Sequence, residues 1–406
     1  MKPKHILVVS QYFHPEYFRI NDMCCEWVKR GYKVTVLTGI PNYPRGKFYK
    51  GYGLFKRRKE LWNGIEIIRI PLVSRGKGPI RMVLNYLSFV FSGLFWQRFT
   101  KIDADVVFTF EVSPMTQALI GAEYSKRRNI PHYLYVQDLW PENVVTITGI
   151  KHPVVISPLS RMVDYIYKNS NKIFATSQSF VYEIRKRTPG EENKVIYWPQ
   201  YAEDFYVPLE KNESASDKIP DNGKFKIAFT GNIGKAQGLE LLPKVAKRLK
   251  NESIHDVTFV IIGDGRQKDK LVKDIRKSEV SDYFCMIERQ PAEEISGLLA
   301  ACDAAFVSFS PDPLFEKTIP AKLQSYMACG MPIVAAACGE TQRLIEESCC
   351  GICCGLGDDV ALTQGIKKLI SSDLSTMSVN ARRYFDDNFR KDQLMDEMDE
   401  YFLAVF

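Results

Sequence analysis

The turn at residues 230–238 has the residue types that bind the phosphates of a ligand. It follows an apolar run ending at Phe229 and precedes a stretch typical of a helix. Glycines allow close approach to the backbone, a lysine supplies positive charge, and a helix start offers free N–H groups. The residues concerned are Gly231, Asn232, Gly234, Lys235 and Gln237. This pattern predicts a binding site for a diphosphate.

A second junction of the same kind lies at residues 319–334. Lys322 stands near the start of a predicted helix, and Gly330 ends that helix before the next apolar strand. Thr318 is expected at the helix start, where its hydroxyl and N–H can meet a phosphate. We therefore expect Lys322 and Thr318 to bind the same diphosphate as Lys235. Which lysine contacts the β-phosphate stays open.

A pair of carboxylates in the first half of the chain is suited to proton transfer. Asp138 follows the apolar run at 132–136, and Glu142 lies four residues later. Asp138 can accept the proton of an attacking hydroxyl or orient that hydroxyl, and Glu142 is the alternative for this role. A helix-capping role for Asp138 is the structural alternative.

Apolar runs alternate with helical stretches in both halves, which is the pattern of parallel sheets covered on both faces. In the first half the expected strands are 5–10, 33–37, 65–70, 106–110, 132–136, 172–175 and 195–197. In the second half they are 225–229, 257–262, 283–286, 304–307, 333–336 and 351–354. Ligands of such sheets bind at the carboxyl ends of the strands, where the turns described above should line crevices.

These motifs resemble glycosyltransferase family 4, the retaining enzymes of the GT-B fold. The resemblance rests on the glycine turn with Gln237 and Gly238, on Met-Ala-Cys-Gly at 327–330, and on Asp-Leu-Trp-Pro-Glu at 138–142. It covers nearly the whole chain and is closest to bacterial enzymes that build O-antigen, capsule and exopolysaccharide repeats. It implies an α/β protein with two facing Rossmann-like domains and parallel sheets. It also implies a UDP-sugar donor, which is a substrate, so that no cofactor and no metal is expected.

The resemblance implies further contacts with the donor. The turn that contains Gly263, Asp264 and Gly265 would face the nucleotide, and Arg289 with Gln290 matches the region that reads the base. The implied mechanism is attack on the face from which the diphosphate leaves. The two lysines and the helix N-termini would stabilise that diphosphate, which would itself assist deprotonation of the acceptor.

The chain departs from the family pattern at four positions. The two glutamates of the family fall on Lys317 and Ser325, and an Arg and a Lys of the family fall on Asn232 and Gln237. Ser325 stands where the family receives the ribose hydroxyls. Glu316, next to Lys317, is expected to replace the glutamate that contacts the donor sugar.

The loops after the first strands are expected to bind the acceptor. The candidates are His14, Arg19, Tyr43 and Arg45. The resemblance implies an acceptor domain over 1–204 and a nucleotide-sugar domain over 225–385. Residues 205–224 are rich in Pro, Asn, Ser and Asp, as in an exposed linker. Residues 386–406 would form a helix that returns to the first domain.

Charge is distributed unevenly along the chain. Residues 1–200 contain 30 Lys and Arg against 15 Asp and Glu, a net charge of +15, whereas the remainder has 25 against 33, a net charge of −8. A basic stretch over Arg45–Lys59 is followed by the apolar, aromatic segment Ile80–Gln97. This segment is short and interrupted for a transmembrane span, so we expect an interfacial helix on an anionic membrane or a helix buried on the sheet.

Composition is that of an ordinary soluble protein, with 45% apolar and 25% charged residues. The apolar run at 6–9 is too short for a signal peptide, which predicts a cytoplasmic protein on the inner face of the membrane, with its ten cysteines as thiols. Asp-Ala-Asp at 103–105 is expected to be a strand entry, and the cysteines of 349–354 a buried strand. No nucleic acid partner is expected.

The sequence therefore favours transfer of a sugar, such as an N-acetylated or deoxy hexose, from UDP to a polyprenyl-diphosphate-linked saccharide. Two other functions compete with it. A UDP-sugar 2-epimerase of the same architecture would not require a membrane-binding segment. A non-catalytic membrane-bound scaffold would explain the missing glutamates at Lys317 and Ser325, and it predicts that no nucleotide binds.

Overall fold

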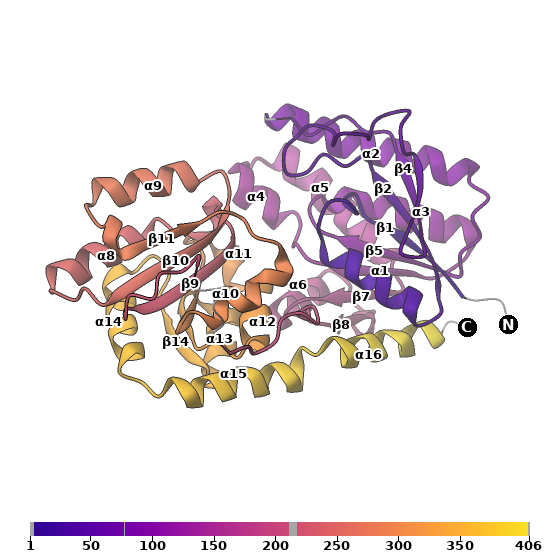
Figure 1. Ribbon diagram of the computed structural model, residues 1–406. Coiled ribbons are helices and arrows are strands. Elements are labelled where there is room, and N and C mark those ends of the chain that lie inside the picture. Colours follow the sequence, from indigo (N-terminus) through magenta and orange to yellow (C-terminus); the bar gives the residue numbers. More distant parts are fainter. Residues whose placement is uncertain (1–3, 77, 211–216, 405–406) are drawn as a thin grey trace. The chain divides into compact units, whose positions relative to one another are not determined.

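The computed structural model describes residues 4–76, 78–210 and 217–404, which form two compact units (Figure 1). The first unit contains the chain up to Trp198 together with the residues from Met398 onwards, and the second contains the chain between them. Each unit is an α/β fold built on its own sheet, as the alternating pattern predicts.

The sheet of the first unit has the strand order β3-β4-β2-β1-β5-β6-β7-β8. Its strands are β1 (His5–Val9), β2 (Lys33–Gly39), β3 (Lys59–Trp62), β4 (Ile65–Ile70), β5 (Val106–Glu111), β6 (His132–Val136), β7 (Lys172–Ala175) and β8 (Val195–Tyr197). All neighbouring pairs are parallel except β3 with β4. The seven expected strands are confirmed, and any ends that differ do so by one or two residues.

Strand β3 is missing from the expected set because it is short and lies at the sheet edge, where its residues alternate between exposed and half-buried. It pairs antiparallel with β4 through a two-residue turn. The turn residues Asn63 and Gly64 have φ values of 49° and 80°. Asn-Gly is the strongest short-range signal of a hairpin, so the sequence does contain the signal for this strand.

Helices cover the faces of the first sheet. They are α1 (Arg19–Lys29), α2 (Pro79–Phe99), α3 (Ala118–Arg128), α4 (Glu142–Thr148), α5 (Pro153–Lys168) and α6 (Gln178–Lys186), with 3-10 turns at Met115–Gln117 and Glu192–Lys194. The end of the chain joins this unit, because the ring of Phe402 packs against Trp27 of α1 and stacks on Tyr133 of β6. Tyr133 also donates its hydroxyl proton to the carbonyl oxygen of Tyr401, at 2.8 Å.

The sheet of the second unit is parallel throughout and has the order β11-β10-β9-β12-β13-β14. Its strands are β9 (Phe225–Asn232), β10 (Val257–Asp264), β11 (Phe284–Ile287), β12 (Ala304–Ser308), β13 (Ile333–Ala336) and β14 (Gly351–Cys354). Strands β9 and β10 are longer than expected because they continue through their glycine turns. Strand β14 is an edge strand with half-buried residues, so the prediction that it is buried is wrong.

The helices of the second unit are α8 (Leu241–Asn251), α9 (Lys268–Lys277), α10 (Ile295–Ala300), α11 (Pro313–Glu316), α12 (Ala321–Ala328), α13 (Gly339–Ser348), α14 (Asp359–Ile370), α15 (Leu374–Asn388) and α16 (Lys391–Leu403), the last of which ends in the first unit. Short 3-10 turns occur at Lys235–Gln237, Ser281–Tyr283 and Ala292–Glu294. Arg382 of α15 donates to the carbonyl oxygen of Ala328 at 2.7 Å, which fixes α15 on α12.

The described part of the expected linker 205–224 packs on the second unit. Ile219 is buried in its core, and Ser296 donates to the carbonyl oxygen of Phe205 at 2.7 Å. The units divide after Trp198, a few residues before the expected boundary. Residues 211–216 lie outside the described residues.

Candidate active site

Two glycines end the central strands of the second sheet side by side. Gly231 of β9 and Gly263 of β10 are paired in register, with φ values of 126° and 153°. A Cβ atom on Gly263 would lie 1.9 Å from the carbonyl oxygen of Gly231. Only glycine allows this approach. The two strands therefore have a pair of residues without side chains near the carboxyl edge of the sheet, where ligands of such folds bind.

The turn after β9 uses its polar side chains to hold its own shape. The N–H of Gly234 donates to Gln237 Oε1 at 3.2 Å. A Cβ atom on Gly265 would lie 2.7 Å from Asn232 Oδ1, so the Asn232 amide lies against the turn that follows β10. Lys235 is exposed at the start of a 3-10 turn. Of these residues, Lys235 is therefore the one positioned to supply charge to a ligand.

The amino group of Lys322 is buried beside Gly231. Its Nζ lies 3.8 Å from the ring centroid of Phe229 on β9 and 3.9 Å from the position that a Cβ on Gly231 would take. Among the described residues it has no hydrogen-bond partner. Burial lowers the pKa of Lys322 to about 7. A buried amino group without a partner at a ligand-binding edge is a candidate anion site, because a bound anion would favour its protonated form.

Tyr326 places Lys322 in this position, and the sequence alone did not single it out. Its hydroxyl oxygen accepts hydrogen bonds from the Thr230 N–H at 2.8 Å and from the Thr230 hydroxyl at 3.2 Å. Residues four apart on a helix lie on the same face, so the contact that fixes Tyr326 on β9 also brings Lys322 to the strand end. This i, i+4 spacing is the signal that could have found it.

Thr318 does not stand at a helix start, which corrects the expectation. It follows α11, its hydroxyl donates to the Leu314 carbonyl oxygen at 3.0 Å, and its N–H donates to Phe315 at 3.3 Å. Pro320 is the N-cap residue of α12, and proline cannot supply the expected N–H. The chain needs an additional turn here to pass from α11 into α12.

The other expected donor residues differ in exposure. Ser325 is buried in α12 and donates to the Ala321 carbonyl oxygen at 3.3 Å, whereas Glu316 is exposed at the end of α11. Asp264 is exposed and accepts a hydrogen bond from the Gly265 N–H at 2.8 Å.

Arg289 and Gln290 follow β11. Arg289 is exposed, and Gln290 Oε1 accepts a hydrogen bond from Lys218 at 2.8 Å. The side chain of Gln290 therefore already has a partner within the second unit, whereas Arg289 is exposed to solvent.

Asp138 lies at the carboxyl edge of the first sheet, where it fixes the loop after β5. Its Oδ2 accepts a hydrogen bond from the Ser113 N–H at 2.7 Å. The hydroxyl oxygen of Ser113 in turn accepts from Trp140 Nε1 at 3.1 Å and Asn143 Nδ2 at 2.6 Å. Burial raises the pKa of Asp138, which favours a proton acceptor. The helix-capping alternative is wrong, because Pro141 is the N-cap residue of α4.

Glu111 lies beside Asp138 and was not expected from the sequence. It is the last residue of β5, it is fully buried, and its Oε2 lies 3.4 Å from the Asp138 N–H nitrogen. Burial and the nearby Asp138 raise the pKa of Glu111 well above its usual range. Glu142, in contrast, is exposed in the first turn of α4. The sequence did not predict a role for Glu111 because this residue ends the apolar run of β5, which is typical of an ordinary buried strand.

The expected acceptor residues lie on several loops at this edge. The His14 ring stacks on Trp62 at 4.2 Å, and burial lowers its pKa. Arg19 is the first residue of α1, Tyr43 is half-buried, and Arg45 is exposed. The His14 ring therefore packs against β3, whereas Tyr43 and Arg45 are accessible to a ligand.

The loop that carries Tyr43 is held by Glu16, whose Oε1 accepts the N–H groups of Asn42 and Tyr43 at 2.6 and 2.5 Å. Burial raises the pKa of Glu16 to about 7. Because the folded pKa exceeds the unfolded value near 4.5, the free energy of unfolding should fall as pH rises from about 4.5 to 7, by up to about 3 kcal/mol. Glu16→Gln keeps the accepting Oε1 and should remove this slope in chemical denaturation at several pH values. An unchanged slope would contradict the assignment.

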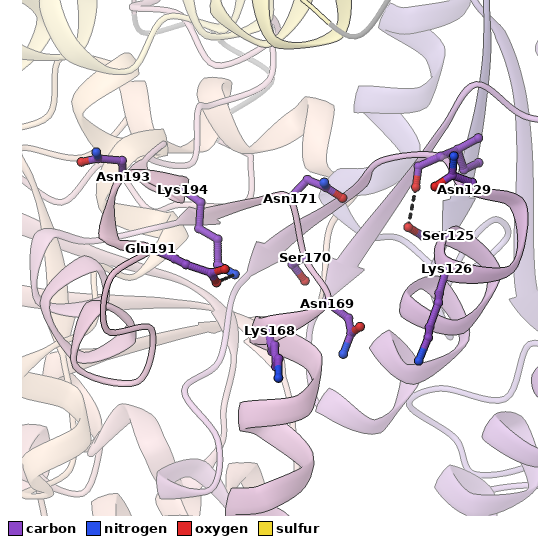
Figure 2. Close-up of a pocket in the computed structure, with 11 residues that line it drawn as sticks. Ser125, Lys126, Asn129, Lys168, Asn169, Ser170, Asn171, Glu191, Asn193 and Lys194 are labelled. Carbon is purple, nitrogen blue, oxygen red and sulfur yellow. Dashed lines mark hydrogen bonds and ion pairs between the residues drawn. The ribbon is translucent and has the colours of Figure 1, made fainter.

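A polar pocket of about 550 Å³ lies elsewhere in the first unit, near the starts of β6 to β8 (Figure 2). Asn171 Oδ1 accepts a hydrogen bond from the His132 N–H at 2.9 Å, Ser125 donates to Ile130, and Lys194 pairs with Glu191. These side chains are used to fix strand starts and helix ends. Ligands of parallel α/β sheets bind at the opposite strand ends, so this pocket is not the candidate active site.

Two other sequence predictions are confirmed. Asp105 Oδ2 accepts a hydrogen bond from the His5 N–H at 2.7 Å, as expected for a strand entry. All ten cysteines are free thiols, among them Cys353, which donates to the carbonyl oxygen of Ala337.

Comparison with known proteins agrees with this geometry. The family described as Glycosyl transferases group 1 matches residues 210–392. WbjE of Pseudomonas aeruginosa, named a probable glycosyltransferase, is 27% identical over 263 residues, which are 63% of this chain and 64% of that protein. WcaI of Escherichia coli strain K12, whose name assigns it to colanic acid biosynthesis as a glycosyl transferase, is 25% identical over 417 residues, or 96% of this chain and 97% of that one.

Solved structures share the fold. HepE of Anabaena in complex with UDP-glucose has a TM-score of 0.71 and 16% identity, with 98% of this chain and 99% of that chain covered. The family match lies within the second unit and includes both glycine turns and Lys322. This chain therefore has the GT-B fold, and its residues 210–392 are a group 1 glycosyltransferase domain.

Proposed function

We propose that this protein is a retaining glycosyltransferase that moves a sugar from a UDP-sugar to a saccharide linked to a polyprenyl diphosphate. The buried amino group of Lys322 beside Gly231 carries the donor part of this proposal. A buried amine without an acceptor costs free energy, and a bound diphosphate would remove that cost. The UDP-glucose in the HepE complex motivates UDP as the nucleotide. The names of WbjE and WcaI motivate surface polysaccharide synthesis.

The chemistry would divide between the units. Lys322 and Lys235 would stabilise the charge that develops on the leaving diphosphate, with no metal required. Asp138 would accept the proton of the acceptor hydroxyl or orient it, and burial raises the pKa of Asp138, which favours this role. Attack would come from the side that the diphosphate leaves, so that the configuration at the sugar carbon is retained. Glu316 remains the proposed contact with an N-acetylated or deoxy hexose.

A nucleotide panel tests the donor. UDP-, GDP- and ADP-sugars would be compared by thermal shift with and without a chelator, followed by assays of UDP release with a lipid-diphosphate saccharide. We expect stabilisation by UDP-sugars alone, about 2.7 kcal/mol at a hundredfold excess over Kd, and no effect of the chelator. If none of the nucleotide sugars changes the melting temperature, the proposal is contradicted and the non-catalytic membrane-bound scaffold is favoured. A UDP-sugar converted at C2 without acceptor would instead identify an epimerase.

Membrane association is the second part of the proposal, and the surface of α2 supports it. Seven large apolar side chains of this helix are exposed at helical spacing, namely Ile80, Val83, Leu84, Leu87, Phe91, Phe95 and Phe99. The opposite face is buried, with Phe89 in the core cluster that contains the strand residue Leu7 and with Gly93 against Ile120 of α3. One face of α2 is thus buried, as the second alternative from the sequence expects, and the exposed apolar face supports the interfacial alternative. No helix among the described residues is long and apolar enough to cross a membrane.

A groove of about 1140 Å³ runs beside the exposed face of α2. It is lined by the rings of Phe91, Phe95 and Phe99 and by basic residues that include Lys59 and Lys101. Aromatic rings beside lysines suit the boundary between acyl chains and anionic headgroups. This combination supports a peripheral protein that lies on an anionic membrane through its first unit.

Removal of the exposed rings should release the protein from membranes. Phe91→Ser with Phe95→Ser should lower binding to vesicles of phosphatidylcholine and phosphatidylglycerol at least tenfold in a sedimentation assay, because each buried ring contributes about 1.5–3 kcal/mol. Val360→Ser with Val379→Ser is the matched control, since both valines are exposed in the second unit. Full retention of the phenylalanine variant on the vesicles would refute this part of the proposal.

A further inference from the structure

Arg75 is enclosed by tyrosine rings at the carboxyl edge of the first sheet. Its guanidinium carbon lies 5.3 Å from the ring centroid of Tyr43 and 5.8 Å from that of Tyr86. Its NH1 group donates to the hydroxyl oxygen of Tyr12 at 3.2 Å. Tyr86 shares a hydrogen bond with Tyr12 as well. Three phenol groups and one guanidinium therefore converge on one point, which we call the Arg75 cluster.

The charge of Arg75 is not neutralised within the described part of the chain. No carboxylate of residues 4–76, 78–210 or 217–404 forms an ion pair with it, and the hydrogen bonds of its guanidinium there go to Tyr12 and to the sulfur of Met82. Arg75 is half-buried, and none of its guanidinium nitrogens is a buried atom without a hydrogen-bond partner. Its remaining N–H donors are therefore accessible from solvent. A partly buried cation lined by neutral rings is a site that an anion would complete.

The segment that carries Arg75 is fixed in place. The Arg75 N–H donates to Asn42 Oδ1 at 3.0 Å, and Asn85 Nδ2 of α2 donates to the Val73 carbonyl oxygen at 2.6 Å. Asn85 Oδ1 also accepts from Gln11, which follows β1, at 2.7 Å. The backbone before Arg75 is thus tied through Asn85 to the end of β1, and the backbone of Arg75 itself is tied to the loop after β2. These contacts give the guanidinium a preorganised position.

The Arg75 cluster lies close to the residues proposed for chemistry. Tyr43, one of its members, was expected to bind the acceptor, and the charge of Asp138 acts on the Tyr86 hydroxyl. The start of α2, which carries the exposed apolar face, also borders the cluster through Tyr86 and Met82. An anion bound here would have its lipid on the α2 side and its saccharide on the Asp138 side.

We propose that Arg75, with the hydroxyl groups of Tyr12, Tyr43 and Tyr86, binds the diphosphate that joins the acceptor saccharide to its lipid. This inference rests on the proposed function, since it names the subsite for the acceptor of that reaction. Guanidinium groups bind phosphate oxygens through two parallel N–H donors, and phenol groups donate to the same oxygens. The aromatic rings would exclude water from the ion pair and strengthen it.

Direct binding tests the subsite. Geranyl diphosphate would be titrated calorimetrically into the full chain with UDP present at saturation, so that the nucleotide site is occupied, and geraniol would report any contribution of the tail. We expect Arg75→Gln to weaken geranyl diphosphate binding at least tenfold. Arg75→Lys should weaken it less, because lysine keeps the positive charge but lacks the two parallel N–H donors of the guanidinium. Arg161→Gln, an exposed arginine of α5 in the same unit, should bind as the wild type does.

The outcomes separate this inference from the proposed function. Wild-type affinity for geranyl diphosphate in Arg75→Gln, or equal binding of geraniol, would overturn the subsite. A purely structural role for Arg75 would lower the melting temperature of the variant without changing its affinity, and this too would overturn it. In transfer assays, support requires a raised KM for the lipid-linked acceptor with an unchanged KM for the UDP-sugar. If wild-type protein binds no UDP, the proposed function fails, and the titration without UDP still tests the subsite.

Discussion

Replacement of Lys322 by methionine should remove UDP binding and transfer while making the unliganded protein more stable. Methionine keeps the apolar contact with Phe229 but has no amino group. The loss of a charge-assisted hydrogen bond to the diphosphate should weaken UDP binding by about 10- to 100-fold, since such bonds contribute about 1.5–3 kcal/mol. The loss of a buried donor without a partner should raise the free energy of unfolding by about 1–3 kcal/mol.

The pH dependence of the same site has a definite sign. The pKa of Lys322 is lowered to about 7 in the folded protein, against 10.5 for an ordinary lysine. The unfolded chain therefore binds more protons between about pH 7 and 10.5, and the contribution of Lys322 to stability should rise with pH across that window. UDP binding at pH 8 should draw a proton onto the amine, which calorimetry in buffers of different ionisation enthalpy detects. Lys322→Met should show neither effect.

Two further lysines serve as comparisons. Lys235→Met tests the alternative contact with the β-phosphate and should have a smaller effect, because Lys235 is exposed to water. Lys244→Met on α8, which is exposed in the same unit, should bind UDP as the wild type does. Unchanged UDP affinity in Lys322→Met would exclude Lys322 from the donor site.

Asp138→Asn should lower the rate of transfer by about 10²- to 10⁴-fold without changing UDP affinity. Asparagine can still accept the Ser113 N–H through its side-chain oxygen, so the loop after β5 should keep its shape. In the wild type the rate should rise with pH as Asp138 ionises, over a range above its usual pKa because burial raises it. The asparagine variant should lose this dependence, which initial rates measured across pH would show.

Glu142→Gln distinguishes the two carboxylates. Glu142 is exposed on α4, whereas Asp138 has Glu111 beside it and a raised pKa. A large loss of rate in Glu142→Gln with little loss in Asp138→Asn would transfer the proposed role to Glu142. If both variants retain full activity, proton transfer by either carboxylate is excluded.

Local patterns predicted most of the fold. Runs of Val, Ile and Leu predict the parallel strands, and glycines predict the turns after β9 and β10. Both features are formed by residues that are close together in the chain. Strand β3 was missed because a short charged edge strand has no such run. Thr318 was misplaced because the sequence does not show that α11 ends before a separate helix begins at Ala321.

Local periodicity was enough to predict that Asp138 and the glycine turns stand at strand ends and that Lys322 stands at a helix start. The electrostatic state of these residues depends on the tertiary structure. The amine of Lys322 is unpaired because Tyr326 fixes α12 against β9, and Asp138 meets Glu111 because β5 and β6 are neighbours in the sheet. The Arg75 cluster likewise joins segments far apart in the chain. Burial and pairing depend on contacts between distant residues, which spacing along the sequence does not encode.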